Sequence, residues 1–410
     1  MDDINLITLP NGIRVAHREV NHTKTVHCGF ILDIGSRDER EDQQGIAHFL
    51  EHMAFKGTTS RKAYHIINRL ESVGGELNAY TTKEKIYFYA STLDKHFDRS
   101  FELLTDITFH SSFPEREIEK EKGVILEEMA MYLDAPEDAI VDEFDEVIFK
   151  GHSLGYNILG TQETVRGFGQ HDFREFLDEH LNSEGIIISV VGNVTEKEVV
   201  AAANKYLSEL PQFKGAVTRS GEFKFESSAI QKIKRIQQAH CMIGRDSFAL
   251  GNKKRMPFLV LNHLFGGPGM TSRLNMNLRE KNGLVYTVES NYAAYKDTGI
   301  FNIYFGTEKK QLNRSKKLVF AEMKKLREKE LGKVQLASIK EQICGQLAMA
   351  EESNVGMMQM MGKSLLDLGR IDTLSSIFDQ INKVSAKQLQ DLANEMFVED
   401  QLSELTYIPE

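Results

Sequence analysis

The 410-residue sequence predicts an α+β protein whose second half repeats the element order of the first. Two observations support this class. Short runs rich in β-branched residues alternate with longer runs of helical periodicity along the whole chain. Each half also runs from a strand through helices to a pair of strands, further helices and a closing strand. The predicted domains are residues 1–210 and 236–410, with a linker at 211–235.

Turn and strand signals define the first half. Asn11-Gly12 lies between two β-prone runs and predicts a hairpin over residues 4–20, because Asn-Gly favours the tight turn of a hairpin. Gly74-Gly75 ends a helix and precedes two strands. The strands are expected at 25–35, 76–81, 85–91 and 186–191. The helices are expected at 45–55, 61–73, 96–110, 114–149, 161–168, 171–180 and 196–210.

The second half follows a segment with no sustained periodicity. Residues 211–235 carry glycines, serines and six basic residues, which is typical of a linker. Strands are then expected at 238–243, 284–292, 299–306 and 402–408, and helices at 255–265, 272–282, 311–328 and 336–350. A methionine cluster at 357–361 indicates core packing, with a peptide-binding surface as the alternative.

Composition excludes several classes of protein. The chain has 50 Lys+Arg and 60 Asp+Glu, and this net charge of −10 gives no general attraction for nucleic acid or anionic lipid. The longest apolar run, near 185–191, is far shorter than the ~18–20 residues of a membrane helix. Three scattered cysteines (Cys28, Cys241, Cys344) are too few for a disulfide framework. The acidic start lacks the features of a targeting peptide, so a cytoplasmic location is expected.

The densest chemistry lies in the segment His48-Phe-Leu-Glu51-His52. Residues i and i+4 share one face of a helix, so both imidazoles can reach a single ion. Two neutral imidazoles suit zinc, and Glu51 beside them can take a proton from a bound water. The alternative is a pair of surface histidines on an ordinary helix.

A third candidate ligand comes from the helix that follows Pro114. Its inward stripe is spaced 3–4–3–4 and consists of Ile118, Glu121, Ile125, Glu128 and Tyr132. An unpaired carboxylate on an inward face is costly. Glu121 and Glu128 therefore need a metal, a histidine or an arginine as partner, and an internal salt bridge is the alternative to a metal site.

These residues carry a resemblance to a known family. His48-x-x-Glu51-His52 is the inverted zinc motif of the inverzincins, and its flanks up to Thr58 resemble the pitrilysin family. The processing-peptidase branch, with the mitochondrial processing peptidase β-subunit and its bacterial relatives, is the most similar. The resemblance implies one zinc ion per chain, held by His48, His52 and Glu128. It also implies that Glu51 is the catalytic base and that Glu121 supports the site from outside the ligand set.

The resemblance extends to the fold and to substrate binding. It implies two similar domains, each a mostly antiparallel sheet covered by helices, that form a clamshell around a chamber. Residues 74–81 look like the family's substrate-binding edge strand, to which a peptide would add through backbone hydrogen bonds. The expected contacts are at Asn78, Ala79, Tyr80 and Thr81. A plain hairpin strand is the simpler interpretation of the same residues.

The second half contributes two further residues by resemblance. Gly266–Leu274 is similar to the family's Gly-rich segment, and Arg279 and Tyr286 match the residues that reach the substrate from the second domain. Arg279 would anchor the substrate, and Tyr286 would donate a hydrogen bond to the oxyanion. By themselves they would be a solvated helix residue and a strand residue. His263 lacks a Glu-His partner, so the second domain is expected to be an inactive repeat.

Together these features predict a zinc-dependent endopeptidase that cleaves short or unfolded peptides. The acidic net charge favours basic peptides. A dimer is expected, either of identical chains or with a related zinc-free chain. The alternatives are an active subunit that needs such a partner, a non-catalytic assembly subunit of the same fold, and a zinc hydrolase that acts on another bond, such as an amidase.

Overall fold

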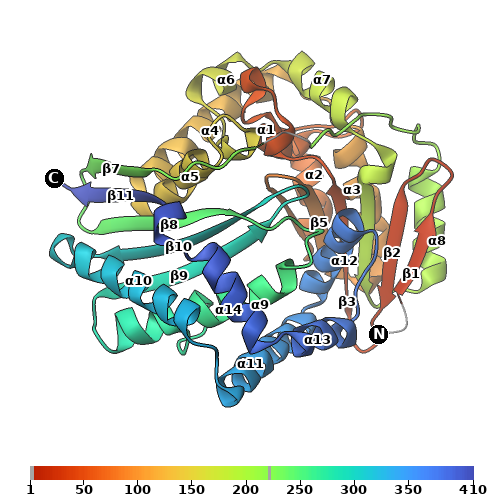
Figure 1. Ribbon diagram of the computed structural model, residues 1–410. Coiled ribbons are helices and arrows are strands. Elements are labelled where there is room, and N and C mark those ends of the chain that lie inside the picture. The colour runs from red at the N-terminus through yellow and green to blue at the C-terminus, as the bar shows by residue number, and fades with distance from the viewer. Residues whose placement is uncertain (1–3, 220–222) are drawn as a thin grey trace. The chain divides into compact units, whose positions relative to one another are not determined.

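The computed structural model describes residues 4–219 and 223–410 (Figure 1). Residues 1–3, the acidic start, and residues 220–222, part of the predicted linker, lie outside the described residues. The chain divides into two compact units. The first unit comprises residues 4–129, Tyr156–Arg219 and Met349–Asp372. The second unit comprises Ala130–Gly155, residues 223–348 and Thr373–Glu410.

The first unit is built on a six-stranded sheet. Its strands, in spatial order, are β1 (Ile4–Thr8), β2 (Arg14–Glu19), β6 (Ile186–Gly192), β3 (Thr25–Leu32), β5 (Ile86–Leu93) and β4 (Glu76–Thr81). All neighbours are antiparallel except β2 and β6. The predicted hairpin is confirmed as β1 and β2, and Gly12 in its turn has a φ of 91°, which favours glycine. β4 lies at an edge of the sheet.

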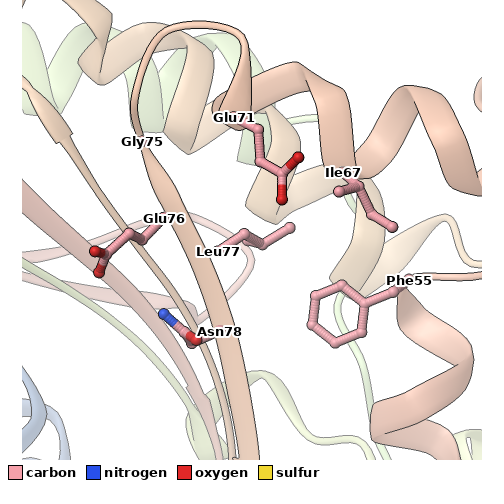
Figure 2. Close-up of a pocket in the computed structure, with 7 residues that line it drawn as sticks. All are labelled: Phe55, Ile67, Glu71, Gly75, Glu76, Leu77 and Asn78. Carbon is pink, nitrogen blue, oxygen red and sulfur yellow. The ribbon is translucent and has the colours of Figure 1, made fainter.

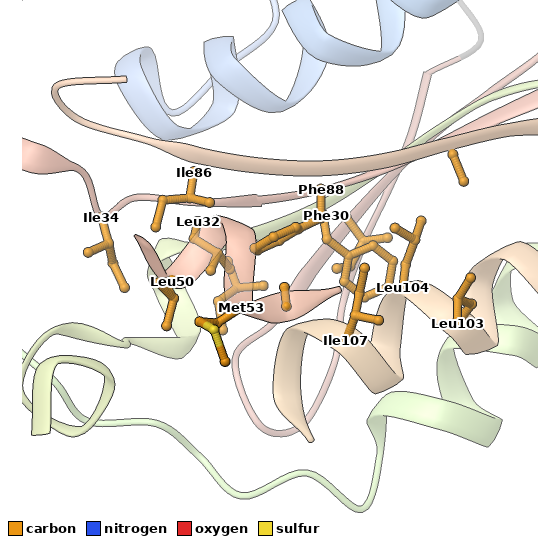
Figure 3. Packing of buried hydrophobic residues seen from close by; sticks show 14 of the residues in the cluster. Phe30, Leu32, Ile34, Leu50, Met53, Ile86, Phe88, Leu103, Leu104 and Ile107 are labelled. Carbon is orange, nitrogen blue, oxygen red and sulfur yellow. The ribbon is translucent and has the colours of Figure 1, made fainter. Parts of the chain in front are cut away.

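Helices bury one face of this sheet. The helices of the first unit are α1 (Ile46–Ala54), α2 (Ala63–Glu71), α3 (Phe97–Phe109), most of α4 (Glu115–Asp134), α6 (Gln162–Gly167), α7 (Gln170–His180), α8 (Glu196–Leu207) and α12 (Asn354–Leu368). Figure 3 shows Phe30 and Phe88 of the sheet close to Leu104 and Ile107 of α3, within one buried cluster. Alternation along a strand sends successive side chains to opposite faces, so Phe30 belongs to this cluster and Ile31 does not.

α12 covers the opposite face of the first sheet. Met357, Met358 and Met361 are at most 2% exposed and pack with Ile31, which confirms the core-packing interpretation of the methionine cluster. The approach is close, because a Cβ on Gly362 would lie 2.0 Å from Ile31 Cδ1. A larger residue at position 362 would therefore force the Ile31 side chain to move.

The second unit repeats the sheet topology of the first. Its strands, in spatial order, are β7 (Ala229–Lys234), β11 (Ser403–Pro409), β8 (Ala239–Ser247), β10 (Gly299–Thr307) and β9 (Val285–Ala294). β7 and β11 are parallel, and the other neighbours are antiparallel. This is the pattern of β2-β6-β3-β5-β4 in the first unit, so the predicted repeat and the α+β class are confirmed.

Helices cover the second sheet on both faces as well. They are α5 (Pro136–Ile148), α9 (Arg255–Gly266), α10 (Leu312–Glu328), α11 (Lys333–Glu351), α13 (Leu374–Lys383) and α14 (Ala386–Met396). α5 packs Ile140 and Phe144 against Met242 and Leu405, and the other face carries the larger cluster that contains Phe301. Each sheet is thus covered on one face by a helix from the other half of the chain: α12 for the first and α5 for the second.

Several local features differ from the prediction. The single helix expected at 114–149 is broken at Ala135, because Pro136 favours an extended residue before it and begins α5. β7 lies inside the expected linker. Its side chains are almost all exposed, so its sequence shows no alternation of buried and exposed residues that would predict a strand. Part of the helix expected at 272–282 is a π-helix, Asn275–Glu280. The compact units also differ from residues 1–210 and 236–410 by the exchange of α5 and α12.

Within the described ranges, no helix combines the length and the apolar character that crossing a membrane requires.

Candidate metal centre

α1 carries the histidine motif and is fixed at its start by a buried carboxylate. Glu39 accepts hydrogen bonds from the backbone N–H groups of Gly45 and Ala47, both at 2.9 Å. These bonds satisfy donors that a helix start leaves free. Gly45 has a φ of 93°, and a Cβ there would lie 2.5 Å from the Leu159 carbonyl oxygen. The sequence analysis did not identify Glu39, since no local spacing signals a cap six residues away.

Three candidate ligand atoms converge beside α1. The donor atoms of His48, His52 and Glu128 lie within 4.8 Å of one another, and no other such group occurs in residues 4–219 and 223–410. Glu128 Oε2 lies 3.8 Å from His48 Nε2 and 3.6 Å from His52 Nε2. The two imidazole rings are 4.5 Å apart, as expected for positions i and i+4. The structure therefore brings together the three residues that the sequence analysis selected.

This donor set fits a zinc ion. Zinc bonds of about 2.0–2.2 Å in tetrahedral geometry place neighbouring donors about 3.3–3.6 Å apart. Burial, with a smaller contribution from His52, lowers the pKa of His48 to about 3, so its imidazole is neutral at pH 7. His48 Nδ1 is buried and has no hydrogen-bond partner in the described part of the chain. A neutral imidazole with Nε2 facing a carboxylate is a suitable zinc ligand.

Glu121 fixes the orientation of His52. Its Oε1 lies 3.1 Å from His52 Nδ1, which leaves His52 Nε2 facing Glu128. Lys56 Nζ lies 2.6 Å from the other Glu121 oxygen. Burial acts to raise the pKa of Glu121, but the hydrogen bonds from His52 and Lys56 outweigh it and lower the pKa. Glu121 is thus a carboxylate that accepts a hydrogen bond from His52 Nδ1–H and leaves the Nε2 lone pair for an ion.

The stripe that predicted these glutamates is buried only in its first part, and the side chain of Glu128 is 30% exposed. Ile118, Glu121 and Ile125 are at most 5% exposed. Tyr132, however, is 41% exposed, and Met129 is the last buried residue of α4. The physical reason is that the first unit ends at Met129, so the next turn of α4 has no core of that unit beneath it.

Glu51 lies next to the metal ligands and contacts β4. Its Oε2 accepts a hydrogen bond of 2.7 Å from Thr81 Oγ1. Burial raises the pKa of Glu51, while the Thr81 hydroxyl acts in the opposite direction. The sequence analysis assigned Thr81 to substrate binding and missed this side-chain contact. Strand alternation was the available signal, because it places Leu77, Ala79 and Thr81 on one face of β4.

The other predicted substrate-binding residues lie along β4. Tyr80 points to the opposite face from Thr81, where it stacks on Tyr87 with ring centroids 4.3 Å apart. Asn78 is exposed and Ala79 is partly buried. Because β4 is an edge strand, its outer backbone groups have no neighbouring strand in the first sheet. Addition of a peptide to this edge remains a prediction.

Arg279 and Tyr286 lie in the second unit. The Arg279 guanidinium lies over the Tyr286 ring, 5.4 Å from its centroid, and Tyr286 is 80% exposed. Arg279 and Tyr286 therefore contact each other. Their roles in substrate binding and catalysis remain predictions. His263 lies on α9, where burial lowers its pKa.

Comparison with known proteins identifies the family. Residues 14–162 match the family described as Insulinase (Peptidase family M16), and residues 168–343 match the Peptidase M16 inactive domain. An uncharacterized zinc protease of Bacillus subtilis, YmxG, is 34% identical over 97% of this chain and 96% of its own length. The chain belongs to peptidase family M16.

Other M16 relatives agree with this assignment. An uncharacterized zinc protease of Rickettsia felis is 34% identical over 97% of this M16 chain and 95% of its own length. A crystal structure of a protease from Helicobacter pylori has the same two-domain fold, with a TM-score of 0.91, 22% identity and 99% coverage of both chains. A Pseudomonas fluorescens structure, described as a peptidase M16 inactive domain, also gives a TM-score of 0.91, at 16% identity and with 100% and 98% coverage. The predicted pitrilysin-type family and fold are confirmed, and the processing-peptidase branch remains a prediction.

Proposed function

We propose that this M16 protein is a zinc-dependent endopeptidase that hydrolyses short or unfolded peptides. The observation that carries the proposal is the convergence of His48 Nε2, His52 Nε2 and Glu128 Oε2 beside the half-buried Glu51. The relatives named zinc proteases support the same reaction class.

The ligand residues would hold one zinc ion, which supplies Lewis-acid chemistry that makes water a nucleophile near neutral pH. Glu51 accepts the proton of the attacking water and returns it to the leaving amine. Its burial raises its pKa, which suits a group that must both accept and release a proton. The Thr81 hydroxyl holds one Glu51 oxygen at 2.7 Å and limits its rotation.

β4 is the proposed substrate strand. A peptide that pairs with its outer edge gains backbone hydrogen bonds without regard to sequence, and only an extended chain can do so. Because Thr81 is the last residue of β4 and bonds to Glu51, the base would lie beside the bound peptide at that end of the strand. Arg279 and Tyr286 would anchor the substrate and stabilise the oxyanion, and the exposed Tyr286 hydroxyl is accessible for this role.

The test uses the purified chain, a quenched unstructured basic peptide and a measurement of bound zinc. Cleavage should stop with chelator and return with added zinc. Glu51→Gln should abolish turnover while zinc stays near one per chain. Zinc loss in that variant would make Glu51 a ligand instead of the base. A zinc-loaded chain that cleaves no peptide would contradict the proposal and favour the non-catalytic alternative.

A further inference from the structure

The two ends of β4 are held differently. At its start Glu76 and Asn78 are exposed, and a pocket of about 460 Å³ lies beside them. Figure 2 shows the Glu76 and Leu77 side chains on opposite sides of this part of the strand. At its end Thr81 donates the 2.7 Å hydrogen bond to Glu51. The position of the candidate base relative to β4 therefore depends on what fixes the residues that follow Thr81.

A tight turn connects β4 to β5. The Thr82 N–H donates to the Lys85 carbonyl at 2.8 Å, and the Lys85 N–H donates to Thr82 Oγ1 at 2.9 Å. The loop after β3 packs against this turn, because the Arg37 N–H donates to the Lys83 carbonyl at 2.8 Å. A Cβ on Gly35 would lie 2.4 Å from the same carbonyl oxygen, so the loop approaches the turn closely.

Arg219 binds both the loop and the turn. Its side chain is 5% exposed, and all three guanidinium nitrogens donate hydrogen bonds. Nε and Nη2 donate to the two Asp38 oxygens at 2.9 and 2.7 Å, and Nη1 donates to Asp33 Oδ1 at 2.7 Å. Nη2 also donates to the Asp33 carbonyl at 3.0 Å and to the Glu84 carbonyl of the turn at 2.8 Å. Charge-assisted bonds from a planar guanidinium are strong and fix the orientation of their partners.

Two further ion pairs hold the same turn. The Glu84 carboxylate pairs with Arg37 at 2.5 Å, and both side chains are at most 7% exposed. Lys85 pairs with Asp367 of α12, and both of these side chains are 5% exposed. Arg219 differs from these residues in its place in the chain, because it lies in the predicted linker and is the last residue of the segment Tyr156–Arg219 of the first unit. Its bond to the turn joins positions 135 residues apart.

We propose that Arg219 is a positioning residue of the candidate catalytic site. It fixes the turn after β4 and thereby holds the Thr81 hydroxyl where it bonds to Glu51. The proposal rests on the proposed peptidase function, in which Glu51 is the base. A base that is displaced from its substrate by a small distance loses much of its effect on the rate. The end of the first unit's chain would thus support catalysis without contact with the substrate.

Amide hydrogen exchange of the zinc-loaded full chain measures the effect of Arg219 on the turn directly. Arg219→Met keeps a long unbranched side chain and removes every donor. It should speed exchange of the Thr82 and Lys85 amides by about tenfold or more, because local opening of the turn becomes easier. This measurement needs no turnover.

Two additional variants separate this effect from a general loss of stability. Arg219→Met leaves the Asp38 carboxylate buried without its cation, which is costly. Arg219→Met combined with Asp38→Asn removes both charges, and the asparagine oxygen can still accept the hydrogen bond from the Gly35 N–H. Arg61→Met is the matched control, since Arg61 pairs with two carboxylates of α3 at 2.5 and 2.6 Å. It should leave exchange in the turn and kcat unchanged.

A double-mutant cycle tests whether Arg219 acts through Thr81. Arg219→Met should lower kcat for a quenched peptide about three- to tenfold, the net value of one typical hydrogen bond, and leave bound zinc unchanged. In a chain that carries Thr81→Val, the same substitution should change kcat by less than about twofold, because the bond to Glu51 is already absent. A merely structural role of Arg219 would give the same fall in kcat in both chains.

Two results would overturn the proposal: unchanged exchange in the turn, or equal falls in kcat with and without Thr81→Val. The peptidase function fails separately if the unsubstituted zinc-loaded chain cleaves no peptide. Faster exchange in the turn of such a chain would refute the peptidase and, with it, the positioning role. Unchanged exchange in a chain that cleaves peptides would refute the role of Arg219 alone.

Discussion

The two units place the same pair of elements next to each other with different side chains. In each unit a helix follows a central strand and is tied to the edge strand by a hydroxyl residue. In the first unit, Thr81 of β4 donates to Glu51 of α1 at 2.7 Å. In the second unit, Ser290 of β9 and Asn262 of α9 are joined by two bonds of 3.1 and 3.2 Å to backbone oxygens. Both units thus have a helix that bonds to an edge strand. In the first unit this helix carries a carboxylate beside two histidines.

The difference teaches that a few substitutions on a shared frame separate a candidate catalytic centre from a structural contact. α9 has His263, but Asn262 takes the adjacent position and bonds to the strand backbone. His263 is half-buried on α9, whereas His48 and His52 face a carboxylate.

The largest expected effect separates the two helices. Glu51→Gln should lower kcat by a factor of about 10²–10⁴, the usual contribution of a general base, and leave bound zinc unchanged. His263→Gln is the matched change on α9 and should leave both kcat and zinc content unchanged. Steady-state kinetics and metal analysis on the same samples check both. Loss of zinc from the His263 variant would show that the second unit also contributes to the metal centre.

A smaller effect is expected at Glu121, which positions His52. Glu121→Gln should weaken zinc binding by about 10–100-fold, because the amide no longer holds the Nδ1–H proton as a carboxylate does. Zinc-buffer competition measures the change. Glu119→Gln is the control, since Glu119 on the same helix bonds to Lys122 and its side chain is 70% exposed. Equal affinities of the two variants would contradict the role of Glu121.

The exchanged helix gives a prediction for stability. Gly362→Ala should destabilise the first unit by about 1–3 kcal/mol, because the new Cβ would overlap Ile31 at 2.0 Å. Gly345→Ala in α11 is the control, since nothing lies within 4 Å of its Cβ. Alanine there should stabilise by about 0.5–1 kcal/mol. Denaturant unfolding of both variants measures the difference, and equal midpoints would show that α12 can move away from the sheet.

Much of this comparison could be predicted from the sequence, because its signals are local. Asn11-Gly12 set the first hairpin, and the spacing of His48, Glu51 and His52 placed three side chains on one helix. The 3–4–3–4 spacing along α4 predicted Glu121 and Glu128 as partners of the histidines.

The remaining features depend on contacts between distant segments. The methionine cluster indicated core packing but not which sheet it covers, so the helix exchange was missed. β7 is an exposed edge strand without alternating apolar residues, so its segment was predicted as part of the linker. The Thr81–Glu51 contact joins residues 30 positions apart and needs the register of β4 against α1.

The smallest expected effect tests how closely the edge strand and the candidate base are coupled. Thr81→Val keeps the shape and β-branching of the side chain but removes its hydroxyl, so Glu51 loses the 2.7 Å hydrogen bond that holds one of its oxygens. We expect kcat to fall about three- to tenfold, the net value of one typical hydrogen bond, with little change in KM. Thr81→Ser should restore kcat because it restores the donor. Ser290→Ala on β9 removes the hydroxyl that bonds to the Asn262 carbonyl of α9 and should leave kcat unchanged. If valine raised KM instead, Thr81 would act through substrate binding along β4 and not through the position of Glu51.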